Sequence, residues 1–283
     1  MSQYQTFEQN LIKLSIELKN KLKEFSKYSC TSSSQDFQEL TFEGKAFQSI
    51  LREDYKHYFE LLRVLFIRHP ESTNEKLESF NNDILNAINQ EGFSMFVDSC
   101  GEIFSKAYSA LDSQIKLLEE ALREKKHRYV FVPDTNTLIN NPTLENWYFD
   151  NIDEFWILLL PTVLSELDDL KINHRNEAVR EKCNSLIRKL KEYRRRGRLN
   201  EGVPIIKNRI YVKSKATEPD FNNSLSWLDP ENKDDRIIAR FLEVIREQIN
   251  TSVILVTSDI NLQSKLEFAR LSFVEPPSVS KGA

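Results

Sequence analysis

The spacing of apolar residues changes near Lys126, and this change constrains the fold more than any other feature. Before it, apolar side chains recur every three or four residues, as they do on the buried face of an amphipathic helix. After it, the short β-rich runs "YVFV", "FWILLL" and "SVILVT" alternate with helical patterns. Such alternation is typical of a parallel sheet with helices on both faces. The sequence therefore predicts a helical bundle over residues 1–126 and an α/β domain over residues 127–283.

Long apolar stripes account for most of the first domain. They run over residues 7–25, 47–65 and 104–122, and a shorter stripe covers residues 77–88. The breaks between them fall near Thr31–Ser34, His69–Pro70 and Gly92. This pattern predicts about four helices joined by short loops. Aromatic stripes with this spacing are more often core than ligand site, so no chemistry is predicted in this domain.

Several classes of protein are excluded before any motif is considered. No apolar run approaches the roughly 20 residues of a membrane span, and the first residues show no secretory signal, so we expect a cytoplasmic protein without a membrane partner. The cysteines have no zinc-site spacing, and we interpret them as small core or surface residues. The histidines are scattered, and none accompanies a nucleophile motif. The cysteines are Cys30, Cys100 and Cys183, and the histidines are His57, His69, His127 and His174. Any reaction must therefore depend on carboxylates.

Acidic residues collect where the predicted strands end and where helices begin. They are Asp134, Glu166, Asp234, Asp235 and Asp259. Each one alone is explained as a helix cap or a solvated residue. Together they converge, because the carboxyl ends of parallel strands lie at one edge of a sheet. Converging carboxylates repel one another unless a cation lies among them, and Mg²⁺ prefers oxygen ligands.

The segments around these acids also resemble a known family. "PDTNTLI", "LPTVLSELDDLK", "NKDDRII" and "LVTSDINLQSK" are similar, in the same order, to the four acidic motifs of PIN-domain nucleases. The nearest variant is the large-PIN type of the nonsense-mediated-decay endonuclease and the exosome PIN module. The resemblance covers residues 128–275. It implies a three-layer α/β/α domain with a central parallel sheet, and it says nothing about residues 1–126.

The resemblance also implies a role for each matching residue. The four catalytic acids would be Asp134, Glu166, Asp235 and Asp259. Asp234 competes with Asp235 for the third place and is counted with the others as a metal ligand. Thr135 and Asn136 would hold the waters of the metal, and Asn261 resembles a polar residue that supports the ligands in the last motif. The implied activity is cleavage of single-stranded RNA with one or two Mg²⁺ or Mn²⁺ ions, often endonucleolytic and leaving a 5′-phosphate.

A basic segment offers a means for this acidic protein, of formal net charge −4, to bind an anion. Residues 171–198 hold 11 Lys and Arg against three Glu, a local excess of +8. Such a run is explained as well by a solvated helix face with cations near its C-terminus. Beside an acidic site it is also a candidate for binding the phosphates of a nucleic acid. The candidate RNA-binding residues are Lys171, Arg175, Arg188, Lys189, Arg194 and Arg195.

Two other functions compete with the nuclease. A phosphatase of the haloacid-dehalogenase type also begins with an Asp after the first strand, but it requires a second Asp two positions later, where this chain has Asn136. An interaction protein that acts through its helical domain, with the PIN fold as a scaffold, is the second alternative. The helical domain itself would bind a partner protein, recruit RNA or mediate self-association, and the sequence does not choose among these.

Overall fold

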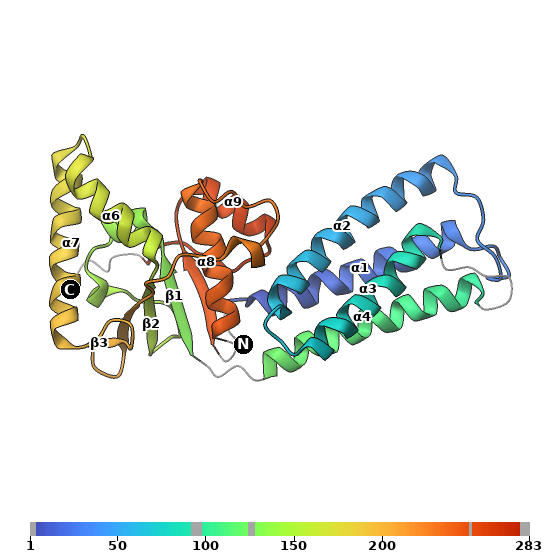
Figure 1. The fold of residues 1–283 in the computed structure, drawn as a ribbon, viewed down its shortest axis with the longest axis horizontal. Coiled ribbons are helices and arrows are strands. Elements are labelled where there is room, and N and C mark those ends of the chain that lie inside the picture. The colour runs from blue at the N-terminus through green and yellow to red at the C-terminus, as the bar shows by residue number, and fades with distance from the viewer. Residues whose placement is uncertain (1–3, 92–97, 124–127, 249–250, 278–283) are drawn as a thin grey trace. The chain divides into compact units, whose positions relative to one another are not determined.

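The computed structural model describes residues 4–91, 98–123, 128–248 and 251–277 (Figure 1). Its contacts divide the chain into two compact units. One is Glu8–Glu124, and the other is Lys125–Ala283 together with the short segment that ends at Phe7. The boundary predicted between residues 126 and 127 and the break predicted at Gly92 both lie outside the described residues. The division into 1–126 and 127–283 therefore stays a prediction.

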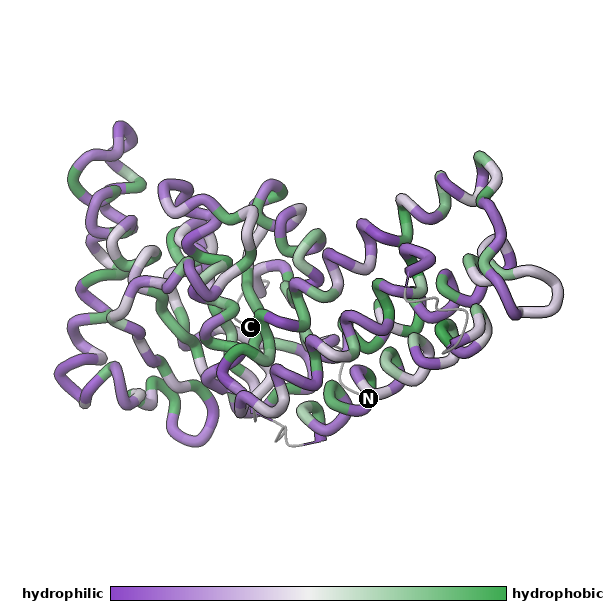
Figure 2. Tube along the Cα trace, turned by 45° about the vertical axis from the view of Figure 1, so that its right-hand side comes forward, coloured by the Kyte–Doolittle hydropathy of each residue, from purple (hydrophilic) through white to green (hydrophobic). Residues whose placement is uncertain are grey.

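The first unit is helical, as its apolar stripes predicted. Its described part contains α1 (Phe7–Ser29), α2 (Phe42–Phe66), α3 (Glu71–Asn89) and α4 (Cys100–Arg123). Figure 2 shows hydrophobic and hydrophilic residues alternating along these helices. The hydroxyl of Thr41 caps α2 by accepting a hydrogen bond from the Gly44 amide. Among the described residues, no helix has the length and apolar character needed to cross a membrane.

Two of the cysteines are bonded to each other, so our interpretation of them as small core or surface residues is wrong. Cys30 follows α1 and Cys100 begins α4, and the two form a disulfide with their Cα atoms 5.9 Å apart. They are separated by 70 residues of sequence, so only the packing of the helices brings them together. Cys183 is free and buried, as expected of a small core residue. Disulfides are rare in reducing compartments, so the cytoplasmic location remains a prediction that this bond does not support.

The second unit is a three-layer α/β/α domain built on a mostly parallel sheet. Its described strands are ordered β3-β4-β2-β1-β5-β6. All neighbours pair in parallel except β3 and β4, which are antiparallel. The strands are β1 (Tyr129–Pro133), β2 (Phe155–Leu159), β3 (Val203–Ile206), β4 (Ile210–Ser214), β5 (Ser252–Val256) and β6 (Phe273–Val274). In Figure 1, α6 and α7 lie on one side of the strands and α8 and α9 on the other.

The helices of this unit begin where the sequence places helix-start residues. They are α5 (Thr135–Asn140), α6 (Pro161–Asn173), α7 (Glu177–Arg196), α8 (Lys233–Glu247) and α9 (Ile260–Phe268), with short 3-10 turns at Leu144–Asn146 and Phe221–Asn223. Pro161 opens α6, and side chains of Asp134, Asn176, Asn232 and Asp259 cap α5, α7, α8 and α9.

The predicted strands are β1, β2 and β5, and the sequence analysis missed β3, β4 and β6. Each missed strand lies in the outer part of the sheet. β3 is an edge strand that contains Pro204, and β6 is only two residues long. Neither has the long apolar run by which a buried central strand is recognised.

A short N-terminal segment packs onto the second unit. The ring of Tyr4 lies 6.4 Å from that of Tyr129 and 6.1 Å from that of Phe131, in edge-on geometry. The Ser272 hydroxyl donates a hydrogen bond to the Gln5 carbonyl. Since these contacts join opposite ends of the sequence, no local sequence pattern predicts them.

A fragment of residues 125–283 is expected to fold alone, because it holds every strand and every site residue. It should unfold at a lower urea concentration than the same unit in the full chain, since it lacks Tyr4. The substitution Tyr4→Ala in the full chain should have a similar effect and lower the free energy of unfolding of this unit by about 0.5–1.5 kcal/mol. Urea unfolding followed by circular dichroism measures both. An insoluble fragment beside a soluble full chain would contradict the prediction.

Candidate active site at the carboxyl edge of the sheet

Asp134 lies at the C-terminal end of β1, where its carboxylate has two partners. One oxygen, Oδ1, accepts a hydrogen bond of 2.6 Å from the Thr137 amide, which makes Asp134 the cap of α5. The other, Oδ2, accepts from the hydroxyl of Thr257 at the end of β5. The side chain is only 4% exposed. Burial raises the pKa of the Asp134 carboxyl, the charge of Asp259 raises it further, and the two hydrogen bonds oppose these effects.

Glu166 approaches Asp134 from α6. Its Oε2 atom accepts a hydrogen bond of 2.7 Å from the hydroxyl of Thr135, the residue that follows Asp134. Its Oε1 atom lies 3.2 Å from the Nζ atom of Lys233, the first residue of α8. Glu166 therefore connects the end of β1 with the start of α8 through its two carboxylate oxygens.

Asp259 lies just beyond β5 and caps α9. Its Oδ1 atom accepts hydrogen bonds from the Asn261 and Leu262 amides, at 2.8 and 3.2 Å. Its own amide donates to the Thr257 hydroxyl at 3.0 Å. Because the same hydroxyl donates to Asp134, Thr257 joins the acids at the ends of β1 and β5.

The neighbours Asp234 and Asp235 share the first turn of α8 but face different surroundings. Asn232 caps both amides. Asp235 is 5% exposed, and both of its carboxylate oxygens have partners: Oδ1 lies 2.6 Å from the Nζ atom of Lys265, and Oδ2 accepts from the Asp229 amide at 3.0 Å. Asp235 thus holds the preceding loop and α9 to the start of α8.

Asp234 is partly exposed and lies within the electrostatic influence of the other acids. Burial raises the pKa of the Asp234 carboxyl, and the charges of Asp259, Asp235 and Glu166 raise it further, against the opposing effect of Lys265. A nearby carboxylate disfavours the charged form of Asp234 in this way. Asp234 is therefore the member of the pair whose carboxylate stays partly exposed under the influence of these charges.

A comparison with protein families agrees with this geometry. A PIN domain model matches residues 131–274, just over half of the chain, from β1 to β6. The chain belongs to the PIN-domain family. PIN domains are generally nucleases and typically use divalent metals. A comparison with curated proteins finds no match.

The donors at this PIN-domain edge suit a hard divalent cation. They are carboxylate and hydroxyl oxygens, which Mg²⁺ and Mn²⁺ prefer. Within the described ranges, no three Asp, Glu, His or Cys side chains are already arranged to bind one ion together. A Mg²⁺ site commonly uses one or two carboxylates and completes its shell with waters.

The remaining polar residues predicted for the site divide into two groups. Thr135 is buried and bonded to Glu166. Asn136 and Asn261 have exposed side chains at the starts of α5 and α9.

The sequence analysis missed Thr257, Lys233 and Lys265. The first has a recognisable signal, because a hydroxyl residue stands at a strand end two positions before an acid.

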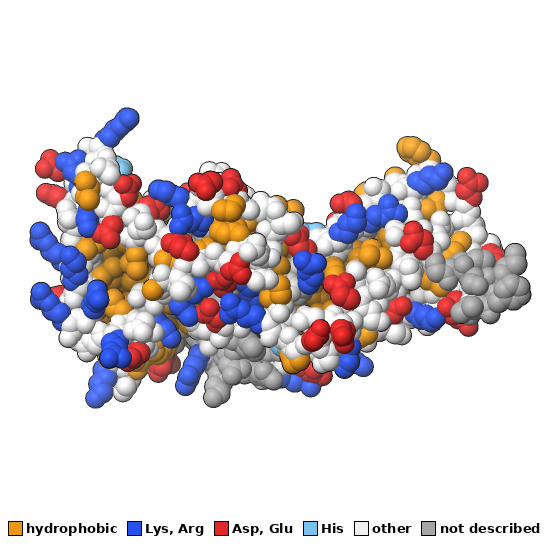
Figure 3. Space-filling model, in the orientation of Figure 1, with side chains coloured by type: hydrophobic (Ala, Val, Ile, Leu, Met, Phe, Trp, Pro, Cys, Tyr) orange, Lys and Arg blue, Asp and Glu red, His pale blue; other side chains and the backbone are white. Residues whose placement is uncertain are grey.

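The basic residues of α7 border a groove beside this edge. The groove has a volume of about 600 Å³, and its lining includes Arg194, Arg195, Arg196 and Arg198 together with Leu164 and Ser214. Leu164 lies two residues before Glu166 on α6, and Ser214 is the last residue of β4. Figure 3 shows lysine and arginine side chains gathered on the α7 side of this unit. The groove therefore opens at the same edge of the sheet as the acids.

The structure places only part of the predicted RNA-binding set at this groove. Arg194 and Arg195 line it and are exposed. Lys189 lies 3.7 Å from Glu145, and Lys171 is paired with Asp168. Arg175 and Arg188 are exposed but do not line the groove.

Proposed function

We propose that the protein is a metal-dependent endoribonuclease that hydrolyses phosphodiester bonds of single-stranded RNA, with Mg²⁺ or Mn²⁺ as its cofactor. The support for this proposal is the position of Asp134, Glu166 and Asp259 at one sheet edge, where Thr135 and Thr257 link them, beside an arginine-lined groove. We assign it to the large-PIN type, on the resemblance of the four motifs.

The acids and the arginines have complementary tasks in this proposal. Asp134, Glu166, Asp234 and Asp259 would hold one or two divalent ions. When bound, such an ion lowers the pKa of a coordinated water and polarises the phosphodiester. Hydrolysis at this edge would join a water oxygen to phosphorus and break the bond to the 3′ oxygen, which would take a proton from the water, so that a 5′-phosphate and a 3′-hydroxyl remain.

Other residues keep the acids in place. The Thr257 hydroxyl holds the Asp134 carboxylate, and the Thr135 hydroxyl holds that of Glu166. Lys233 and Lys265 balance part of the negative charge through Glu166 and Asp235. We infer that Asp235 positions α8 and α9, and that Asp234 is the third metal-binding acid.

A cleavage assay with the purified full chain tests this function. Single-stranded RNA should be cut in the presence of Mn²⁺, cleavage should stop when a chelator is added, and single-stranded DNA of the same sequence should be cut more slowly. The cut fragments should accept no phosphate from a polynucleotide kinase until a phosphatase removes their 5′-phosphate. Absence of cleavage with both Mn²⁺ and Mg²⁺ would instead favour the scaffold alternative.

The substitution of Arg194 and Arg195 by glutamine tests the groove. If each arginine contacts a phosphate, RNA affinity should fall, and the slope of log affinity against log salt should become shallower by about 0.7 for each lost contact. Cleavage at saturating RNA should be nearly intact, because no acid has been changed. Binding is measured in Ca²⁺ at several salt concentrations, so that cleavage does not interfere.

The matched control replaces Lys182 and Lys191 by glutamine. These residues are exposed on the same helix and do not line the groove, so the control removes the same charge elsewhere. Its salt slope should equal that of the unmodified protein. Equal slopes in the two double variants would show that α7 is only a solvated basic face.

A further inference from the structure

A second cavity lies on the α8 side of the sheet. Its floor comes from three neighbouring strands, with Val130 on β1, Trp156 and Leu158 on β2, and Lys213 on β4. Arg128, Gln248 and Thr251 complete the lining. The cavity has a volume of about 240 Å³. Val130 and Asp134 are separated by four residues of extended chain, roughly 13 Å, whereas Leu158 and Lys213 each lie one residue before the carboxyl end of their strand. The lining named here shares no residue with the acids or with the arginine-lined groove.

The indole of Trp156 is held in one orientation. On one side it stacks against Tyr211, with ring centroids 4.8 Å apart and planes inclined by 13°. Gly202, at φ +109°, approaches its edge so closely that a Cβ atom there would lie 2.2 Å from Cζ3 of the indole. A glycine is therefore required at residue 202 both for its backbone conformation and for space.

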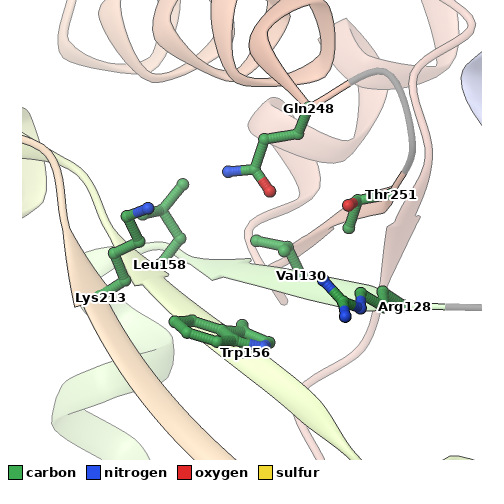
Figure 4. A pocket seen from close by; sticks show the side chains of 7 residues that line it. All are labelled: Arg128, Val130, Trp156, Leu158, Lys213, Gln248 and Thr251. Atoms are coloured by element: carbon green, nitrogen blue, oxygen red, sulfur yellow. The ribbon is translucent and has the colours of Figure 1, made fainter. Parts of the chain in front are cut away.

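The other face of the indole has room beside it. Trp156 is paired in register with Tyr211 on β4 and with Val130 on β1, so the two neighbours stand on opposite sides of it. Val130 is much smaller than Tyr211, which leaves space over β1 against the free face of the ring. Figure 4 shows the indole along the floor of this space and the Gln248 amide pointing into it. The arrangement suits the insertion of a planar group.

The cavity also carries positive charge. The Lys213 ammonium and the Arg128 guanidinium come from opposite sides of the cavity, and none of the described residues that line it is acidic (Figure 4). In the described part of the chain, neither cation forms an ion pair. A cavity with a free aromatic face and two available cations complements a planar aromatic ring that carries an anionic group.

We propose that this cavity binds a nucleotide. The base stacks on Trp156, the phosphate is bound by Lys213 and Arg128, and the Gln248 amide and Thr251 hydroxyl donate or accept hydrogen bonds with the base or the sugar. Stacking on an aromatic side chain accepts any base, so the site is expected to show little base preference. The bound nucleotide is either a free mononucleotide or one residue of a single-stranded RNA. The proposal does not depend on nuclease activity.

Calorimetric titration of the full chain with adenosine 5′-monophosphate in EDTA tests the site while no metal is available to the acids. We expect saturable binding that weakens about tenfold in Lys213→Gln and in Arg128→Gln. The matched control Lys207→Gln removes an exposed charge from the β3–β4 turn, outside the cavity, and should bind within about twofold of the unmodified protein. Trp156→Leu should abolish the preference for the nucleotide over ribose 5-phosphate, and circular dichroism checks its folding.

Titration with single-stranded oligoadenylate, also in EDTA, identifies the source of the nucleotide. If Lys213→Gln weakens the binding of both ligands, the site accepts a residue of an RNA strand. If it weakens only that of the mononucleotide, the ligand is a free nucleotide. The proposal is overturned if neither ligand binds, if inorganic phosphate or ribose 5-phosphate binds as tightly as the nucleotide, or if both glutamine variants bind like the unmodified protein. Because no step involves cleavage, an inactive nuclease would leave these outcomes unchanged.

Discussion

The variant Asp134→Asn is expected to cleave single-stranded RNA more than about tenfold more slowly than the unmodified protein, a loss of transition-state stabilisation above roughly 1.4 kcal/mol. The change keeps the size of the side chain and removes a charge from the centre of the acidic group. An asparagine oxygen can still accept the hydrogen bond from the Thr137 amide, so the cap of α5 should survive. The initial rate of cleavage in Mn²⁺ measures the effect.

Measuring the stability of Asp134→Asn shows whether slower cleavage results from a lost metal ligand or from a damaged fold. Burial and the charge of Asp259 raise the pKa of the Asp134 carboxyl, which means that its charged form is disfavoured in the folded protein. Thermal unfolding without metal should therefore occur at an equal or higher temperature. The control Asp153→Asn neutralises an exposed acid and should change neither property. Undiminished cleavage by Asp134→Asn would refute the assignment of the active site.

The substitutions Asp234→Asn and Asp235→Asn are expected to affect different properties, RNA cleavage in the first and stability in the second. Asp235→Asn should lower the free energy of unfolding by about 1–3 kcal/mol, because it breaks a partly buried ion pair with Lys265 and weakens the bond to the Asp229 amide. Asp234→Asn should leave stability nearly unchanged, because the carboxylate is partly exposed and its acidic neighbours repel it. It should nevertheless lower RNA cleavage more than about tenfold.

Urea unfolding and cleavage rates, measured on both variants, decide between the two acids. Cleavage by Asp235→Asn should be restored at a temperature low enough to keep the protein folded, if this residue only positions α8 and α9. Should Asp235→Asn remain folded and inactive while Asp234→Asn is fully active, the third metal-binding acid is Asp235, as the motif comparison first suggested.

Much of this fold follows from local sequence patterns. The spacing of apolar residues before residue 123 is enough to predict α1 to α4, since each helix must bury one face. The runs "YVFV", "FWILLL" and "SVILVT" predict β1, β2 and β5, the central strands whose two buried faces require continuous apolar residues. Parallel strands then bring Asp134 and Asp259 to one edge, because residues that follow their carboxyl ends must meet there.

Features that depend on contacts between distant segments were decided only by the tertiary structure. The Cys30–Cys100 disulfide, the packing of Tyr4 against β1 and the stacking of Trp156 on Tyr211 join residues that no local pattern relates. The roles of Asp234 and Asp235 differ for the same reason. Successive residues of a helix point about 100° apart, so the Asp235 carboxylate contacts Lys265 and a loop amide while that of Asp234 stays partly exposed. The sequence by itself determined that acids stand at the start of α8, and only the packing of α9 and the loop before α8 determined which of them pairs with Lys265.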